Sequence, residues 1–449
     1  MKLAANNHPH IKTALPGPRA QAMIARDAAV ISPSYPRDYP FVMSHGLGTE
    51  VWDVDGNRFL DFAAGIAVCS TGHAHPQVVA AVKSAADQFL HISSDYWHEQ
   101  MVGLGERLAR VAPMNTLAGE PAMSFLCQSG TEAVEGSLKL ARYVTGRQRF
   151  IGFLGGFHGR TMGSLSFTSS KYTQQIGYAP TMPGVTHVPY PNPYRPLFAG
   201  ADQGKAVLDY IRMLFERSVP ASEVAAILVE PIQGEGGYIV PPDGFLAGLR
   251  ALCDQHGILL IFDEVQSGAG RTGKMFACEH WGVAPDIMTL AKGLGSGLPI
   301  GAIVAKKSLM SQWKRGSHGN TYGGNPITCA AANATLDLVS GGFADNAEKV
   351  GAHFMTRLQE LARDYPSIGE VRGKGLMIGM ELVEDDAART PARALCDAVI
   401  TRAFHNGMLL LSCGTSTVRF MPPLNTSAEQ IDEAVALLRL SLDQALAGG

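Results

Sequence analysis

Short apolar runs alternate with helical stretches between about residue 120 and residue 305. Helical periodicity marks 130–144 and 245–256. Between and around them lie six short apolar runs, at 123–127, 150–154, 224–229, 258–262, 286–290 and 300–305. Continuous apolar strands separated by helices are typical of a mostly parallel sheet covered on both faces. The pattern predicts an α/β domain that binds its ligand beyond the carboxyl ends of the strands.

The pattern changes on both sides of this region. Near the N-terminus, two β-type runs within 51–62 flank Asp55-Gly56, which predicts a hairpin with a tight turn. The C-terminal third predicts a smaller α+β unit, with helices at 346–365, 392–406 and from 428 and strands at 376–382, 409–412 and 418–420. We expect residues 1–75 to form an N-terminal arm and part of the small domain, 76–335 the large domain, and 336–449 the C-terminal small domain. The first 40 residues are interpreted as an arm over the fold or over a partner subunit.

Composition narrows the class of protein. Thirty-seven basic residues against forty acidic ones give a net charge of −3, without the basic excess of a nucleic-acid binder. No apolar run approaches 18 residues, and the N-terminus has no apolar signal region, so neither a membrane span nor secretion is expected. Seven scattered cysteines without a CxxC motif predict a reduced cytoplasmic protein with no disulfide framework and no metal site. Fifty glycines among 449 residues indicate many tight turns and close backbone approaches.

The first candidate for ligand chemistry is the start of the helix predicted at 130–144. Ser129, Gly130 and Thr131 follow an apolar strand and open this helix. Free N–H groups and the positive end of the helix dipole suit a phosphate there. A serine in this place is also an ordinary helix cap, so the segment alone leaves both interpretations open.

Two strand ends carry an acid and a base. Asp263 follows an apolar strand, and a buried carboxylate there needs a partner such as a protonated heteroaromatic nitrogen. Gln266 could bond a second atom of the same ligand, whereas Asp263 could instead cap the next helix or pair with an arginine such as Arg271. Lys292 ends another strand among glycines. Partial desolvation would lower its pKa and make it a nucleophile for carbonyls, unless it is simply a surface lysine.

An aromatic residue, a histidine and an arginine meet at the turn formed by Phe157, His158, Gly159 and Arg160. Phe157 could stack on a flat ring and Arg160 could hold a carboxylate, or they are a packed aromatic beside a surface arginine. Taken together, the candidates define a ligand with a phosphate, a basic aromatic nitrogen and an aldehyde. Pyridoxal 5′-phosphate has these three groups, and enzymes bind it through a lysine and an acidic residue.

An ordered set of motifs carries a family resemblance from about residue 45 to the C-terminus. The chain resembles the class III aminotransferases, which are fold type I pyridoxal-phosphate-dependent transferases. The motifs are DFAAGIAVCSTGHAHP (61–76), SGTEA (129–133), FHGRTMGS (157–164), VEPIQGEGG (229–237), FDEVQSGAGRTG (262–273), AKGLGSGLP (291–299), NTYGGNP (320–326) and VRGKGLMIGMEL (371–382).

The resemblance implies a role for each matching residue. Lys292 is the Schiff-base lysine and the acid and base of the proton shift, and Asp263 keeps the pyridine nitrogen protonated. Gln266 contacts the ring hydroxyl, and Phe157 stacks on the ring with His158 beside it. The helix start at Ser129, Gly130 and Thr131 holds the phosphate. Thr321 holds the same phosphate from the neighbouring subunit, which implies a homodimer with shared active sites and leaves a tetramer open.

Four further residues bear on the substrate. The resemblance places Ile66 and Arg160 in the distal pocket and pairs Glu230 with Arg419, an arginine that grips the α-carboxylate of glutamate or 2-oxoglutarate when the pair opens. These residues favour transfer from an ω-amino acid, best 4-aminobutyrate, to 2-oxoglutarate through ping-pong half-reactions. The alternatives are an acetylornithine, ornithine or lysine ω-aminotransferase, an amino-acid racemase or epimerase of the same fold, and a catalytically idle cofactor-binding protein.

Overall fold

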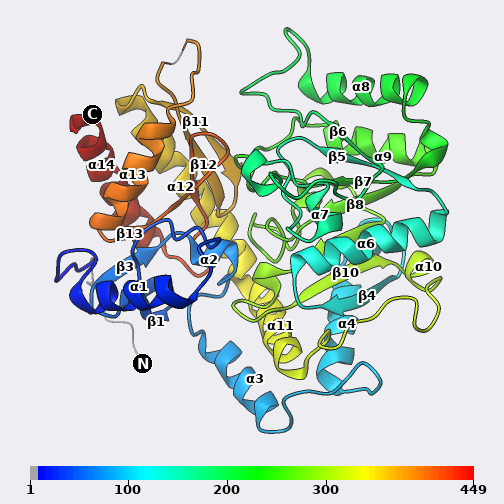
Figure 1. Cartoon of the computed structure of the whole chain (residues 1–449), viewed down its shortest axis with the longest axis horizontal. Helices are drawn as coiled ribbons and strands as arrows, with labels where there is room; N and C mark the ends of the chain where they lie inside the picture. The colour runs from blue at the N-terminus through cyan, green and yellow to red at the C-terminus, as the bar shows by residue number, and fades with distance from the viewer. Residues whose placement is uncertain (1–8, 386, 449) are drawn as a thin grey trace.

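The computed structural model describes residues 9–385 and 387–448. A seven-stranded sheet forms the centre of its larger part, on the right of Figure 1. Strand β10 is antiparallel to both neighbours, and the remaining pairings are parallel. The prediction of an α/β fold with a mostly parallel sheet is confirmed. The strand order is β4 (Ala122–Cys127), β10 (Gly301–Lys306), β9 (Ile287–Leu290), β8 (Leu259–Asp263), β7 (Val224–Val229), β5 (Arg149–Phe153) and β6 (Val185–Val188).

Alternate side chains of the central strands pack on opposite faces of this sheet, as the two-residue period of a strand requires. Ile227 and Val229 of β7 enter a core with α4 (Glu99–Val111), α8 (Gln203–Arg217), α9 (Phe245–His256) and α11 (Pro326–Leu338). Ala226 and Leu228 enter a separate core with α6 (Gly130–Thr145). Because both faces are covered, β7 is buried along its whole length and reads as an uninterrupted apolar run.

A second group of elements has its own core, on the left of Figure 1. Its helices are α12 (Ala344–Asp364), α13 (Arg393–His405) and α14 (Ala428–Ala447). One of its sheets has the order β11 (Ile368–Lys374), β12 (Met377–Leu382), β15 (Thr417–Phe420) and β14 (Leu411–Cys413). The other has the order β1 (Met43–Leu47), β2 (Glu50–Asp53), β3 (Arg58–Asp61) and β13 (Met408–Leu409). Strand β3 pairs parallel to β13, so strands from the two ends of the chain share one sheet. The domain limits at residues 75 and 335 stay a prediction.

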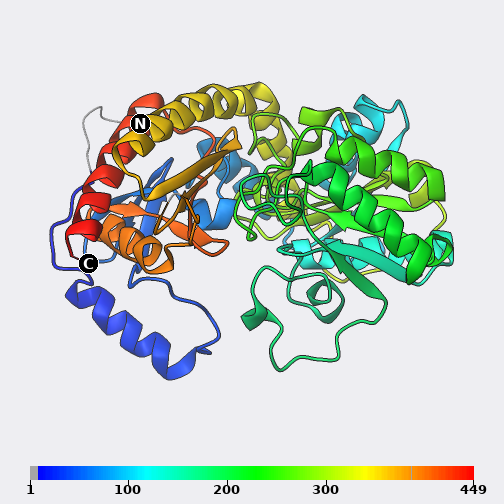
Figure 2. The ribbon, with the colours of Figure 1, turned by 90° about the horizontal axis from the view of Figure 1, so that it is seen from above.

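The N-terminal arm contains a helix that the sequence pattern did not predict, α1 (Pro18–Val30). The Asp55 carboxylate accepts the backbone N–H groups of Arg19 and Ala20 at 2.9 Å, which anchors the first turn of α1 to the hairpin. Beyond this anchor α1 stands away from the rest of the chain (Figure 2). Pro18 has the fixed backbone geometry of a helix start, and only Ala20 is buried. The weak apolar periodicity explains why the helix was missed.

Short elements complete the chain. The predicted hairpin exists, because β2 and β3 are antiparallel around Asp55-Gly56. The remaining helices are α2 (Ala64–Ala67), α3 (Pro76–Ala86), α5 (Pro113–Thr116), α7 (Met162–Leu165) and α10 (Lys307–Met310), with 3-10 turns at Tyr172–Gln174, Ala221–Glu223, Ala277–Trp281 and Lys292–Leu294, and a π turn at Val339–Phe343.

Among the described helices, none is both long and apolar enough to cross a membrane. All seven cysteines are free thiols.

Candidate active site

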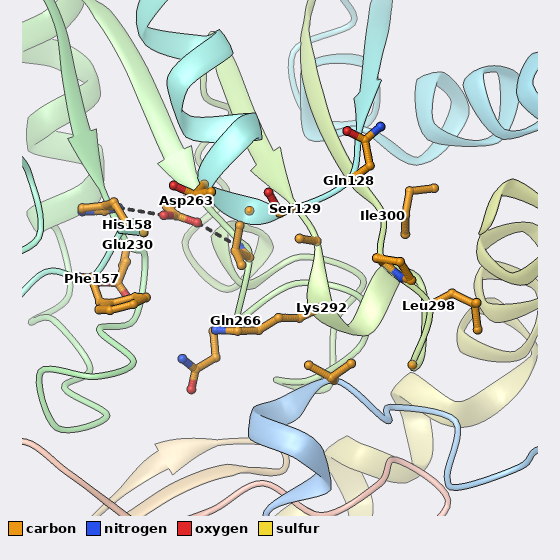
Figure 3. Close-up of a pocket in the computed structure, with 18 residues that line it drawn as sticks. Gln128, Ser129, Phe157, His158, Glu230, Asp263, Gln266, Lys292, Leu298 and Ile300 are labelled. Atoms are coloured by element: carbon orange, nitrogen blue, oxygen red, sulfur yellow. Dashed lines mark hydrogen bonds and ion pairs between the residues drawn. The ribbon is translucent and has the colours of Figure 1, made fainter. Parts of the chain in front are cut away.

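A cavity of about 440 Å³ lies at the carboxyl edge of the seven-stranded sheet. Its size is in the range of small-molecule and cofactor sites. Residues after β4, β5, β7, β8 and β9 line it, as expected for a ligand site of an open α/β sheet. In Figure 3, Phe157, His158 and Glu230 lie at one end and Leu298 and Ile300 at the other. Nine predicted site residues line this cavity: Ser129, Gly130, Thr131, Phe157, His158, Glu230, Asp263, Gln266 and Lys292.

Asp263 and His158 form a buried pair. Nδ1 of His158 lies 2.7 Å from Oδ2 of Asp263 (Figure 3). Oδ1 of Asp263 accepts the backbone N–H of Val265 at 3.0 Å and the hydroxyl of Thr289 at 3.1 Å. Burial acts to lower the pKa of His158, but the hydrogen bond and charge of Asp263 outweigh it and raise that pKa above its ordinary value. A protonated His158 places a positive charge 2.7 Å from the Asp263 carboxylate in the cavity wall.

The alternative partner for Asp263, Arg271, lies elsewhere. The Arg271 guanidinium is fully buried and donates to the carbonyl oxygens of Leu376, at 3.2 Å, and Pro422. Arg271 therefore links the loop after β8 to the C-terminal part of the chain, and it forms no hydrogen bond or ion pair with Asp263. The partners of the Asp263 carboxylate are instead His158, Val265 and Thr289.

Lys292 opens a 3-10 turn after β9 with a backbone φ of 43°, a conformation that costs free energy in a residue with a side chain. Removal from water lowers the pKa of Lys292, while the negative charges of Glu235 and Asp263 act against this shift. A lower pKa increases the fraction of neutral amine, the form that attacks a carbonyl carbon. Lys292 thus lies in a cavity wall and is not a surface lysine, and its role as a nucleophile stays a prediction.

The start of α6 has the features that suit an anion. The Ser129 hydroxyl accepts the N–H of Glu132 at 3.3 Å, so this serine is the helix cap. The Thr131 hydroxyl bonds Thr161 at 2.7 Å and Ser164 at 2.6 Å. The first backbone N–H groups of a helix have no backbone partner within it, and the first two residues of α6, Gly130 and Thr131, line the cavity. The helix-cap interpretation of Ser129 is thus confirmed, and binding of a phosphate by the backbone of the helix start stays a prediction.

Gln266 has one amide atom already engaged. Its Oε1 accepts the Tyr238 hydroxyl at 2.8 Å, which leaves its NH2 group to donate into the cavity. Tyr238 is fully buried and contacts Sδ of Met421 at 3.0 Å, so its hydroxyl is held in place. Tyr238 was not predicted, because nothing in the sequence pattern distinguishes it from an ordinary core tyrosine.

Four predicted residues lie outside the cavity lining. Ile66 is 41% exposed, with a left-handed backbone. Arg160 is exposed, and its guanidinium carbon lies 5.9 Å from the centre of the Phe157 ring. Thr321 is exposed in the loop before α11. Arg419 is buried on β15, close enough to Lys292 to affect its pKa.

The predicted ion pair between Glu230 and Arg419 is wrong. Arg419 pairs with Glu235, five residues further along the same glycine-rich loop. The carboxylate of Glu230 is instead taken up by the backbone N–H groups of Phe157, at 2.9 Å, and Gly234, at 2.8 Å. Glu235 could have been found from its place between Gly234 and Gly236, since a charged residue in such a loop needs a partner outside it.

The chemistry of these residues fits pyridoxal phosphate. The α6 start suits its phosphate, Asp263 its protonated pyridine nitrogen, Gln266 a ring oxygen and Phe157 the ring face. Lys292 supplies the amine for its aldehyde. In the described residues, no cluster of His, Cys, Asp and Glu side chains could hold a metal ion. The fold and this cavity together define a fold type I pyridoxal-phosphate-dependent enzyme.

The chain belongs to the class-III aminotransferases, whose family profile matches residues 32–442. It is 38% identical to an alanine/serine racemase of Pyrococcus horikoshii, over 98% of this chain and 94% of the relative. It is 40% identical to an acetylornithine aminotransferase of Caldanaerobacter subterraneus (93% and 98%) and 37% identical to a 5-aminovalerate aminotransferase of Pseudomonas aeruginosa (94% and 98%). The fold matches a pyridoxal-phosphate-bound amine transaminase from an uncultivated Pseudomonas species, with a TM-score of 0.85 and 32% identity over 97% of this chain and 100% of that structure. The chain is therefore a pyridoxal-phosphate-dependent aminotransferase-family enzyme with small-molecule substrates.

Proposed function

We propose that this enzyme transfers the amino group of an ω-amino acid to 2-oxoglutarate, with 4-aminobutyrate as the preferred donor to test first. One observation carries the proposal: Arg419 is buried, and its charge is neutralised by an ion pair with Glu235. An arginine covered in this way presents no free charge to a substrate that lacks an α-carboxylate. When the pair opens, the same guanidinium can bind the α-carboxylate of 2-oxoglutarate bidentately. One site can thus accept both kinds of substrate.

The residues of the cavity divide the chemical work. When bound, pyridoxal phosphate supplies the electron sink that makes a proton on the substrate carbon acidic. Asp263, paired with His158, would hold the ring nitrogen of the cofactor, and Phe157 would stack on its ring. The amino group of Lys292 then takes a proton from the substrate carbon and returns it to another carbon. Gln266 and the α6 start fix the ring so that this transfer is short.

A second candidate is racemisation or epimerisation of an amino acid. The similarity to the alanine/serine racemase covers 98% of this chain, and an isoleucine 2-epimerase of Lentilactobacillus buchneri is 38% identical over 89% of it. In that case Lys292 would return the proton to the α-carbon. Transfer of the ω-amino group from acetylornithine or ornithine to 2-oxoglutarate is the third possibility within the aminotransferases, supported by the similarity to the acetylornithine aminotransferase.

A series of amino donors tested with the same acceptor distinguishes these functions. The enzyme is incubated with 2-oxoglutarate and, in turn, 4-aminobutyrate, 5-aminovalerate, ornithine, acetylornithine and lysine, and glutamate is measured. We expect the fastest glutamate formation with an ω-amino acid that has no α-amino group. Exchange of the α-proton of alanine or isoleucine in deuterated water, without glutamate formation from any amine, would replace the proposal by the racemase. Preference for acetylornithine or ornithine would keep the reaction but change the donor.

We also propose a cytoplasmic homodimer in which Thr321 of each subunit completes the phosphate site of the other. Large apolar side chains are exposed around 88–100 and next to Thr321, among them Trp97 at 87% and Tyr322 at 60%. A surface of this kind favours a protein partner. Mixing refolded Lys292→Ala and Thr321→Arg subunits tests the sharing. If sites are shared, mixed dimers regain one intact site, whereas unshared sites give no recovery of activity.

A further inference from the structure

Glu230 occupies an unusual position between two loops. It follows β7, is 6% exposed, and offers each carboxylate oxygen to a different part of the chain. Oε1 accepts the backbone N–H of Phe157 at 2.9 Å. Oε2 accepts the backbone N–H of Gly234 at 2.8 Å. One side chain thereby joins the loop after β5 to the loop after β7.

The first of these loops forms the ring end of the cavity. It carries Phe157 and His158, and Figure 3 shows the side chain of Glu230 beside both of them. His158 is held at the other side by Asp263. The amide of Phe157 attaches this loop to the end of β7 next to the ring, and Gln233 makes a second link by donating to the carbonyl of Leu154 at 2.9 Å.

The second loop brings Gln266 and Glu235 to their places. A side chain at Gly234 would overlap the amide of Gln266, so the backbone of this loop packs directly on a cavity residue. The carbonyl of Gly234 also accepts the N–H of Tyr238 at 3.2 Å, and the Tyr238 hydroxyl orients Gln266. The residue after Gly234 is Glu235, the partner of Arg419.

Burying a charged carboxylate costs free energy, even when it accepts two N–H groups. Burial raises the pKa of Glu230 to about 7, the charge of His158 lowers it, and the charge of Asp263 raises it. Glutamine would avoid the cost of a buried charge, but it has one acceptor oxygen and its NH2 group would face an N–H donor. Only a carboxylate of this length can accept from both loops at once.

We propose that Glu230 is a positioning residue that fixes the loop of Phe157 relative to the loop of Gly234 and Glu235. The first loop contributes to the cofactor site, and the second carries the partner of the carboxylate-binding Arg419. One side chain thus positions both parts of the active site. Glu230 acts through these two backbone groups and not on the reacting atoms. The statement about Arg419 rests on the proposed function. The statement about the cofactor site does not.

The test is Glu230→Gln, measured in three ways. The dissociation constant of pyridoxal phosphate is obtained by titrating the apo-enzyme and following the absorbance of the bound cofactor. The KM for 2-oxoglutarate and the midpoint of unfolding are measured alongside. We expect cofactor affinity to fall about tenfold and KM to rise about tenfold, the effect of one buried donor left unsatisfied where Glu230 joins the two loops. Glu230→Asp, which keeps two oxygens but reaches one loop only, serves if the glutamine variant does not fold.

Glu264 provides a matched control. It is also a buried glutamate at this sheet edge, burial raises its pKa to about 7, and it accepts the backbone N–H groups of Ala277 at 3.0 Å and Cys278 at 2.8 Å. Neither contact touches the loops of Phe157 or Gly234. Glu264→Gln should therefore lower the unfolding midpoint while cofactor affinity stays within about twofold.

The outcomes distinguish the inference from the proposed function. If Glu230→Gln changes only the unfolding midpoint, as the control does, Glu230 is structural and the inference is overturned. A double-mutant cycle with Phe157→Leu should show less than additive loss of cofactor affinity, and full additivity contradicts the coupling. If Arg419→Gln raises the KM for 2-oxoglutarate and Glu230→Gln does not, the link to Glu235 fails. If neither changes that KM, the proposed role of Arg419 fails instead.

Discussion

Two buried pairs of opposite charge influence Lys292, and they are bonded very differently. In the pair of Asp263 and His158, the second carboxylate oxygen is also occupied, by the N–H of Val265 and the hydroxyl of Thr289. In the pair of Glu235 and Arg419, the Nε of Arg419 is buried and has no hydrogen-bond partner among the described residues. The first pair is held by the sheet itself. The second joins a loop to β15 and keeps an unused donor.

This difference indicates which pair can exchange partners. Breaking the Asp263 pair would leave several groups unsatisfied in the sheet, whereas a substrate carboxylate could replace Glu235 and also satisfy the unused donor of Arg419. Burial acts to raise the pKa of Glu235, but the charge and hydrogen bond of Arg419 keep it below its ordinary value. Glu235 thus stays charged and able to leave for water. Each prediction below changes one side of this comparison.

The largest effect is expected for Lys292→Ala, because this residue lies under the influence of both pairs. Transamination should fall by about 10⁴-fold, since no other group is placed to move the proton. The absorbance band of cofactor attached to the lysine should also disappear. Lys274→Ala, at an exposed lysine, is the matched control and should keep the wild-type rate. Turnover within about tenfold of the wild type would remove Lys292 from the proton transfer.

Asp263→Asn removes the charge of the fixed pair without changing its size. Turnover should fall by about 10³-fold, because the ring nitrogen loses its negative partner. The pKa of His158, measured by NMR titration, should fall, since burial alone lowers it. A turnover that survives with an unshifted His158 would contradict the role of Asp263.

The same pair predicts a dependence of stability on pH. The pKa of His158 is raised on folding, so the stabilisation is complete below about pH 6.5 and is lost as pH rises through the folded-state pKa. Wild-type unfolding free energy should therefore fall above neutral pH by more than that of Asp263→Asn. Parallel curves for the two proteins would show that the pair does not contribute.

The exchangeable pair is tested by Arg419→Gln and Glu235→Gln together. Losing the arginine should raise the KM for 2-oxoglutarate roughly 10- to 100-fold, the value of one or two charge-assisted hydrogen bonds. Losing the glutamate should leave the KM for 2-oxoglutarate low and raise the KM for 4-aminobutyrate. The reason is that an uncovered arginine attracts the carboxylate of 4-aminobutyrate and binds it in the wrong orientation. Equal effects on both substrates would mean that the pair is only structural.

The smallest effect on the substrate is expected for Arg160→Ala. Its guanidinium is exposed above Phe157, so an interaction with the 4-aminobutyrate carboxylate is screened by water. The KM for 4-aminobutyrate should rise by about two- to fivefold while that for 2-oxoglutarate stays the same. An unchanged KM for both would remove Arg160 from substrate binding.

Residues placed by the strand topology could be predicted from the sequence, whereas residues placed by loop paths and side-chain contacts could not. Asp263 and Lys292 follow apolar strands of one sheet, so the topology rule alone brings them to one edge. β6 and β11 were missed because their runs are short or interrupted by polar residues, as in IGEVRGK. The partner of Arg419 was misassigned because Glu230 and Glu235 share one glycine-rich loop, and the path of the loop decides which carboxylate reaches β15. Tyr238 and the role of Glu230 depend on side-chain contacts that have no sequence period.

The parallel pairing of β3 with β13 has a consequence for how the chain is made. Leu60 lies opposite Met408, about 350 positions later in the chain. A ribosome adding about 5–20 residues per second needs roughly 20–70 s to span that distance. During this time the N-terminal hairpin exposes an unpaired strand edge, which is a hazard for aggregation. The central sheet can form before the final strands emerge. The sheet that contains the N-terminal hairpin is therefore completed last, when β13 pairs with β3.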